Sequence, residues 1–420
     1  IMKVLLKQAK IIDSTSELHN KKKDILIENG RIIKIDDKLN KEGESQVIES
    51  EDLHVSKGWI DLKAHFCDPG HEYKETIQSG LDKAAKGGFT QVAVLPSTSP
   101  VMDQKASIDS ILRKAEGHAV AVIPMGCLTK GMKGKELAEL FDMQKAGALL
   151  FTDDRVATEA GVLSNALMYA QNFNARITVS VGNASLTKNA QVNEGQASLK
   201  TGLKGDPEVS EIIEIERHLR ILDYTKGTLH ISGVSTIEGV NLIREAKKKG
   251  LLVSADTHIM NLCFDESKVL DFDTRFKTHP PLRSNKNNKA LWLALKEGVI
   301  DCVVSNHRPT DQDEKEVDFE SAEFGAPHLQ TLFAALNTAN NLSTNELIEV
   351  LAEKPAKLLE IQTTGIKVDT MANLTIFDPS LSFDSNTLSK KDKAFSPFDL
   401  GKLKGLVIGI IKKGNQKMNI

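Results

Sequence analysis

The sequence has few cysteines and no long apolar segment, and each scarcity excludes a class of protein. The four cysteines, at positions 67, 127, 263 and 302, are far apart and form no Cys-x-x-Cys pair. Such usage is typical of a reducing compartment and disfavours both a disulfide framework and a cysteine-rich zinc site. Because no run of about 18 apolar residues exists, we expect no membrane span. The first residues contain no apolar signal core, so we expect a cytoplasmic protein.

An excess of charge of one sign is also absent. The formal net charge is −3, with 40% hydrophobic and 26% charged residues among 420. This balance provides no electrostatic footprint for nucleic acid or for an anionic membrane, so we expect neither as a partner. The composition is that of an ordinary globular protein, long enough for one large domain and a smaller one.

Both ends of the chain are rich in strand-forming residues. Residues 2–6, 24–27 and 31–35 are rich in strand-forming residues and predict short strands, and Glu28-Asn29-Gly30 fits a hairpin turn between the last two. Residues 372–379 and 405–411 have the same character, whereas 381–404 is polar and predicts a surface crossing. We expect residues 2–55 and 366–420 to join in one small β domain resembling a sandwich.

Between these ends, apolar strand-like segments alternate with amphipathic helical ones. Repeated βα units over residues 56–365 predict a TIM-like (β/α)₈ barrel, because a segment of roughly 300 residues is in the size range of that fold. The strands are expected at 90–96, 119–124, 148–151, 176–181, 228–231, 251–255 and 301–304, and two of the helices at 207–222 and 240–248.

Polar side chains gather where the first barrel strand should end. Asp61, Lys63 and His65 are spaced by two, so on a strand they point to one side, and Pro69-Gly70 ends the segment. The carboxyl ends of barrel strands carry the active sites of this fold. The stretch resembles the dihydroorotase motif Asp-x-His-x-His-x-Arg-Glu-Pro-Gly of the metal-dependent amidohydrolase superfamily. Lys63 stands where the first metal-binding histidine belongs, and Cys67 stands where the substrate-binding arginine belongs.

The resemblance extends to later motifs, and it implies a zinc ion and a carboxylate base at the barrel mouth. Phe151-Thr152-Asp153-Asp154 resembles Phe-Ser-Asp-Asp-Gly, which makes Asp153 the expected metal-binding carboxylate. In the next two motifs Ser180 and Gly233 replace ligand histidines. Ser305-Asn306-His307-Arg308-Pro309-Thr310 resembles Thr-Asp-His-Ala-Pro-His, with Asn306 in place of the general base.

Only His65 and Asp153 remain from the ligand and base positions that the resemblance implies, and two ligands hold zinc only weakly. An ammonium has no lone pair for a metal, so we hypothesise that Lys63 occupies the metal region and pairs with Asp153. Substrate contacts are also replaced, by Cys67, Ser97 and His279. A relocated metal site built from His258, His279 and His307 is a competing interpretation. The predicted remnant pocket comprises Lys63, His65, Cys67, Ser97, Asp153, Ser180, Gly233, His279 and His307.

The resemblance implies a dihydroorotase-like protein linked to pyrimidine biosynthesis, and the replaced residues predict that it lacks metal catalysis and is kept for a structural or binding role. No cofactor is expected. A homo-oligomer is expected, and the resemblance implies aspartate transcarbamoylase as a partner. The alternative is an active, zinc-dependent cyclic amidohydrolase that interconverts dihydroorotate and N-carbamoyl-aspartate. A third interpretation is a binding module whose emptied pocket holds another small molecule.

Overall fold

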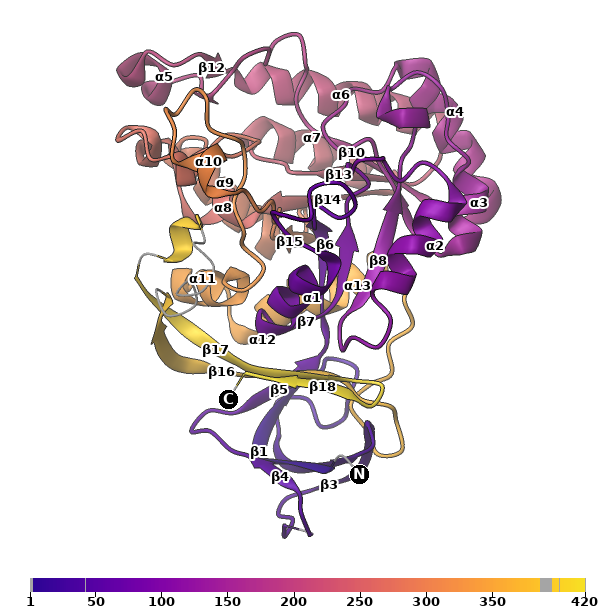
Figure 1. The fold of residues 1–420 in the computed structure, drawn as a ribbon, viewed down its shortest axis with the longest axis vertical. Helices are drawn as coiled ribbons and strands as arrows, with labels where there is room; N and C mark the ends of the chain where they lie inside the picture. Colours follow the sequence, from indigo (N-terminus) through magenta and orange to yellow (C-terminus); the bar gives the residue numbers. More distant parts are fainter. Residues whose placement is uncertain (1–2, 42, 386–394, 400, 420) are drawn as a thin grey trace.

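The computed structural model describes residues 3–41, 43–385, 395–399 and 401–419. A barrel of strands wrapped by helices lies above a β sheet that contains both ends of the chain (Figure 1). Figure 1 also shows strands from the two ends lying side by side beneath the barrel. None of the helices in these ranges is long and apolar enough to cross a membrane.

The barrel consists of eight parallel strands in sequential order. Their residues are nearly all buried and many are aliphatic, which is the pattern of strands covered by helices outside and packed side chains inside. A bridge between Ala64 and His307 returns the chain after the last strand to the first, and His65 N donates to His307 O at 2.8 Å. The strands are β6 (Trp59–Ala64), β7 (Phe89–Val94), β8 (Ala121–Gly126), β9 (Leu150–Phe151), β10 (Arg176–Ser180), β13 (Leu229–Ser232), β14 (Val253–His258) and β15 (Cys302–Val304).

Helices cover the outside of the barrel. Helix α1, for example, begins at a capping box in which Thr76 Oγ1 accepts from Ser79 N, and it buries Ile77, Leu81 and Ala84. The helices are α1 (Ile77–Lys86), α2 (Lys105–Lys114), α3 (Leu140–Ala146), α4 (Ala160–Ala170), α5 (Gln196–Thr201), α6 (Glu208–Thr225), α7 (Ile237–Lys248), α8 (Ile259–Cys263), α9 (Asn285–Lys296), α10 (Gln312–Lys315), α11 (Leu332–Ala339), α12 (Thr344–Ile348) and α13 (Lys354–Leu358). A small parallel pair, β11 (Val192–Asn193) and β12 (Gly205–Asp206), lies outside the barrel sheet.

The second sheet unites the two ends of the chain in the order β18-β17-β16-β5-β1-β2-β3, with β4 paired to β1. It packs on the barrel through an aromatic contact in which Trp59 lies 4.7 Å from Phe333 and 5.3 Å from Phe377, measured between ring centroids. The strands are β1 (Lys3–Ile12), β2 (Lys22–Glu28), β3 (Arg31–Asp36), β4 (Gln46–Ile48), β5 (His54–Lys57), β16 (Asn373–Asp384), β17 (Lys402–Lys412) and β18 (Asn415–Met418).

This architecture confirms the predicted TIM-like barrel with a β domain built from both ends. The surface crossing predicted for 381–404 is wrong at both of its ends. Strand β16 continues to Asp384 and β17 already begins at Lys402, since these residues pair with each other despite their polarity. Residues 386–394 and 400 of that crossing lie outside the described residues. The limits predicted for the two parts, at residues 55 and 366, stay a prediction.

Candidate functional site at the barrel mouth

The residues singled out from the sequence come from the carboxyl ends of the barrel strands. Lys63 lies near the end of β6, Ser180 ends β10, Gly233 follows β13, His258 ends β14 and Asn306 follows β15. Parallel strands place these ends at one mouth of the barrel. The site is therefore assembled from several segments of the chain.

Lys63 reaches across the mouth. Its side chain is buried, and Nζ donates to Ser232 Oγ at 3.1 Å and lies 3.5 Å from His258 Nε2. Burial lowers the pKa of Lys63 to about 8, while the carboxylates of Asp154 and Asp256 act in the opposite direction. The Ser232 hydroxyl accepts this hydrogen bond. The Lys63 amine is therefore held at the strand ends where the family motifs carry metal ligands.

The hypothesis that Lys63 pairs with Asp153 is wrong. Asp153 Oδ1 accepts from Leu128 N at 3.0 Å and from Thr129 N at 2.9 Å, and Oδ2 accepts from Thr129 Oγ1. Burial raises the pKa of Asp153. The carboxylate thus turns away from Lys63 and ties down the loop that follows β8, which is a structural role.

The next residue, Asp154, is the carboxylate that faces the cations. It accepts hydrogen bonds from Arg308 Nη2 and, at 2.9 Å, from Ser97 Oγ. Burial would raise the pKa of Asp154, but the positive charges of Arg308, Lys63 and Arg155 overcome this effect and hold it far below its ordinary value. Asp154 is therefore a firmly ionised counter-ion for three cationic side chains.

Arg155 and Arg308 were missed in the sequence, although a signal for each was present. Arg155 stands at the glycine of Phe-Ser-Asp-Asp-Gly, and Arg308 stands at the alanine of Thr-Asp-His-Ala-Pro-His. Both are half-buried, and burial together with the Arg308 charge lowers the pKa of Arg155 to about 9. Two small residues of the motifs have thus been exchanged for guanidinium groups in this chain.

A second carboxylate at the mouth, that of Asp256, is held by three hydrogen-bond partners. Asp256 Oδ2 lies 2.8 Å from His230 Nε2, and Asp256 Oδ1 accepts from Gly233 N at 2.7 Å and from Ser232 Oγ at 3.2 Å. The other ring nitrogen of His230 contacts Ser254 Oγ at 2.9 Å. His230 therefore orients the ends of β13 and β14 by hydrogen bonding.

Gly233 occupies a conformation that disfavours any side chain. Its φ is +88°, in the left-handed region, and a Cβ built there would lie 3.0 Å from His258 Nε2. A ligand histidine at this position would have to displace His258 as well as strain the backbone.

His65 and Cys67 satisfy each other within the loop. His65 Nε2 lies 2.9 Å from Ser97 O, and Nδ1 accepts from Cys67 N at 3.2 Å. Burial lowers the pKa of His65 to about 4, so the ring is neutral at pH 7. Burial raises the pKa of the Cys67 thiol to about 12, which leaves it protonated and a poor nucleophile.

The remaining positions fall into two groups. Ser180 Oγ donates to the backbone oxygen of Asp154, and His279 borders a cavity of about 360 Å³ beside Arg155. His307 instead contacts Glu75 Oε1 through Nε2 at 2.7 Å and accepts from His328 N through Nδ1, so both of its ring nitrogens are engaged. This separates His307 from a relocated metal site with His258 and His279.

The residues at the mouth do not fit the zinc ion that the resemblance implies. An ammonium and two guanidinium groups surround the ionised carboxylate, and cations repel a metal and cannot ligate it. Among the described residues, no group of three or more His, Cys, Asp or Glu side chains is arranged to hold a metal ion. We therefore derive no chemical step through a metal.

Several buried polar atoms at the mouth have no hydrogen-bond partner. Among the described residues they include a carboxylate oxygen, one atom of each arginine, a ring nitrogen and an amide oxygen, namely Asp154 Oδ1, Arg155 Nη2, His258 Nδ1, Asn306 Oδ1 and Arg308 Nε. Buried polar groups are usually satisfied by protein, water or ligand. The mouth therefore has both donors and acceptors that can form hydrogen bonds with a small molecule.

Comparisons with known proteins agree with the motifs. A family model described as Dihydro-orotase-like matches residues 54–239. A dihydroorotase of Ruminiclostridium cellulolyticum is 36% identical over 405 residues, covering 95% of this chain and 94% of that protein. A dihydroorotase of Thermoanaerobacter sp. is 34% identical over 424 residues, covering 99% and 97%.

Solved structures agree on the fold. An L-hydantoinase from Arthrobacter aurescens superposes with a TM-score of 0.84 at 22% identity, covering 100% of this chain and 98% of that one. A dihydropyrimidinase from Brevibacillus agri gives a TM-score of 0.83 at 21% identity, covering 99% and 95%. Given the sequence identity over nearly its whole length, the chain belongs to the dihydroorotase family.

Proposed function

We propose that this member of the dihydroorotase family does not hydrolyse cyclic amides by metal catalysis and serves pyrimidine biosynthesis as a structural or binding protein. The observation that carries the proposal is the arrangement of Lys63, Arg155 and Arg308 around Asp154. Positive charge that a metal would bring to the mouth is supplied by side chains of the chain itself.

The lack of a proton acceptor at the position where the family carries its base supports the proposal. Water attack on an amide needs a group that accepts a proton near neutral pH, and the amide of Asn306 at the family's base position is not one. The Asp154 carboxylate is too weak a base, because its cationic neighbours hold its pKa far below the ordinary value. Asp256 is occupied by His230, Ser232 and Gly233.

The residue at the position of a substrate-binding arginine also supports the proposal. Cys67, at the position of a carboxylate-binding arginine, is a buried thiol whose nearest contacts are His65 and the Pro309 backbone oxygen. A thiol cannot make the bidentate bonds with which an arginine holds a carboxylate. The loss therefore extends from the chemistry to the recognition of a dihydroorotate-like substrate.

The direct test measures metal and turnover together. The untagged protein, expressed with added zinc, is analysed for metal and assayed with dihydroorotate and with N-carbamoyl-aspartate. The dihydroorotase of R. cellulolyticum, treated identically, is the positive control. We expect far less than one zinc per chain and no turnover above buffer. Stoichiometric zinc with chelator-sensitive turnover would overturn the proposal.

The partner that the family resemblance suggests is aspartate transcarbamoylase, and we propose a homo-oligomer that associates with it. The test is to mix the purified protein with aspartate transcarbamoylase from the same cell and to measure the mass of the complex by light scattering after gel filtration. A co-eluting complex of defined mass is expected. Separate elution at micromolar concentrations would remove this partner from the proposal.

A further inference from the structure

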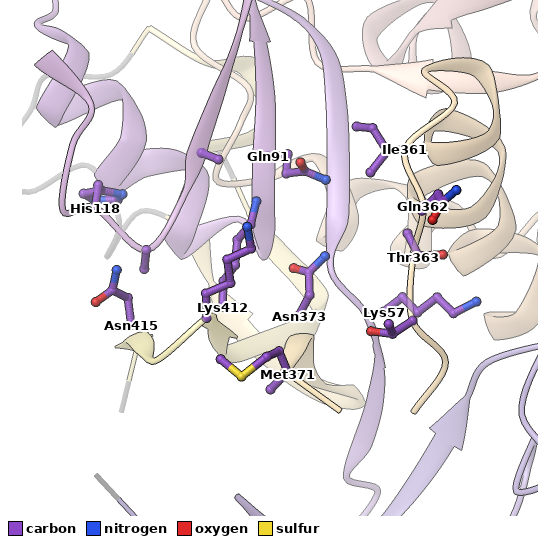
Figure 2. Close-up of a pocket in the computed structure, with 15 residues that line it drawn as sticks. Lys57, Gln91, His118, Ile361, Gln362, Thr363, Met371, Asn373, Lys412 and Asn415 are labelled. Carbon is purple, nitrogen blue, oxygen red and sulfur yellow. The ribbon is translucent and has the colours of Figure 1, made fainter. Parts of the chain in front are cut away.

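A second cavity lies at the opposite end of the barrel from the mouth. It has a volume of about 480 Å³ and is enclosed by the amino-terminal ends of β7 and β8, by residues 361–364 after α13, and by the β domain (Figure 2). The exposed residues 362–364 form part of its rim and leave a route from solvent. Pockets for small ligands have volumes of about 300–1,000 Å³, so this cavity is large enough for one.

The lining of the cavity is strongly cationic. Three of its fifteen lining residues are lysines, and none is an aspartate or glutamate. Lys57 is neutralised, since its Nζ lies 2.8 Å from Asp13 Oδ1. Lys412 donates to Thr90 O at 3.0 Å, and in the described part of the chain neither it nor Lys413 pairs with a carboxylate.

The position of Lys412 is costly without a counter-ion. Burial lowers the pKa of Lys412 to about 7, and the charge of Lys413 acts in the same direction. A charge removed from water is normally paired, because its desolvation is expensive. The cavity thus holds a lysine that gains from the arrival of an anion.

Two amide side chains beside Lys412 also lack partners. Gln91 is 9% exposed, and its side chain makes no hydrogen bond within the described residues. Asn373 Oδ1 is buried and unpartnered. In Figure 2 the amides of Gln91 and Asn373 lie close to the Lys412 side chain and border the same space. Unsatisfied groups gathered in one cavity indicate a site for a polar ligand.

The walls of the cavity are fixed by backbone contacts between distant segments. Gly58 N donates to Asn373 O at 2.8 Å, and Lys413 N donates to Ala372 O at 3.0 Å. A Cβ on Gly58 would lie 2.2 Å from Thr90 Oγ1 and 2.5 Å from Asn373 Oδ1, so only glycine allows this close approach. The cavity is therefore preformed, which reduces the ordering cost of binding.

We propose that this cavity binds a small phosphorylated metabolite, with its phosphate held by Lys412 and Lys413 and its polar remainder bonded by Gln91 and Asn373. Lysine is a common phosphate binder that acts as a compact point charge, whereas the planar fork of arginine binds carboxylate and phosphate alike. The site is remote from the barrel mouth, so a failure of this proposal would not affect the function proposed above, and the reverse also holds.

The test uses the full chain and calorimetric titration with ribose 5-phosphate, with ribose as the uncharged control and succinate as the carboxylate control. We expect saturable binding of ribose 5-phosphate and none of ribose or succinate. Lys412→Met should weaken binding at least tenfold, because a charge-assisted contact is lost, while Lys412→Arg should retain most of it. Lys249→Met, which removes an exposed lysine at the end of α7, is the matched control and should bind like the parent protein.

Three results would overturn the proposal: no saturable binding of ribose 5-phosphate, equal binding of succinate, or unchanged affinity in Lys412→Met. If Lys412→Met does not fold, Lys413→Met replaces it, since that side chain is exposed and its loss leaves the packing intact. Weakened binding in Lys413→Met supports the site, and unchanged affinity in that variant counts against it.

Discussion

Asp154→Asn is the substitution that most directly tests the charge arrangement at the barrel mouth. It keeps the shape of the side chain but removes the negative charge that Arg308, Lys63 and Arg155 share. Removing one partner of a buried ion pair costs about 3–5 kcal/mol, because the other charge stays buried and uncompensated. Asp154 is only 6% exposed, so solvent screens little of this cost. We expect a loss of roughly 3 kcal/mol or more in the free energy of unfolding.

The neighbouring residue provides a matched control. Asp153 is buried as well, but it accepts only from Leu128 and Thr129, whose groups are neutral. In Asp153→Asn the amide oxygen can keep the backbone bonds, so we expect a loss of about 1 kcal/mol, the scale of one neutral hydrogen bond. Urea unfolding followed by circular dichroism, with equal slopes for all variants, measures the difference.

A double variant isolates the coupling between the charges. Adding Lys63→Met to Asp154→Asn removes one of the stranded cations, so part of the lost stability should return, by about 1–3 kcal/mol relative to additivity. Equal destabilisation in Asp153→Asn and Asp154→Asn would refute the reasoning. Strict additivity in the double variant would do the same, because it would mean that Lys63 and Asp154 do not interact.

Three further predictions concern single side chains. Lys63→His should not restore a zinc site, because Gly233 and Ser180 still supply no ligand; elemental analysis showing one zinc per chain would contradict this. Lys412 has a folded-state pKa of about 7 against an ordinary value of 10.5, so the unfolded chain binds more protons between these values. The unfolding free energy of the parent protein should therefore rise relative to Lys412→Met from about pH 7 to about pH 10, and urea titrations showing a constant difference would exclude it. Cys67, buried and with a raised pKa, should be alkylated by iodoacetamide only after unfolding, which mass spectrometry of native and denatured samples can check.

The fold could be predicted because its signals are local and repeated. Buried aliphatic runs at regular intervals predicted the barrel strands, and the family motifs fixed their order. The departures from the family motifs at Lys63, Ser180, Gly233 and Asn306 were also visible, since each lies within a recognisable motif frame. The contacts that these residues make in the folded chain could not be predicted from the motifs.

The choice between Asp153 and Asp154 illustrates the limit. The two residues are adjacent, and Asp154 has a φ of +51°, which sends the two carboxylates to different neighbours. A motif alignment does not contain that turn. The second cavity was equally hidden, because Lys57, Gln91, Asn373 and Lys412 come from segments that meet only when the β domain packs on the barrel.

The exchanges at the mouth depend on one another, and this bears on how charge is balanced there. A carboxylate at the position of Asp154 needs positive charge nearby, and Arg308, Lys63 and Arg155 provide it from three separate segments of the chain. The space beside His258 is available because residue 233 has no side chain. A ligand histidine restored at one of these positions would therefore lie beside a cation or clash with His258. A single substitution is for this reason not expected to restore a metal site. Because its charges are already compensated, the barrel has an electrostatic reason to fold without an ion, so its stability is expected to be independent of zinc supply.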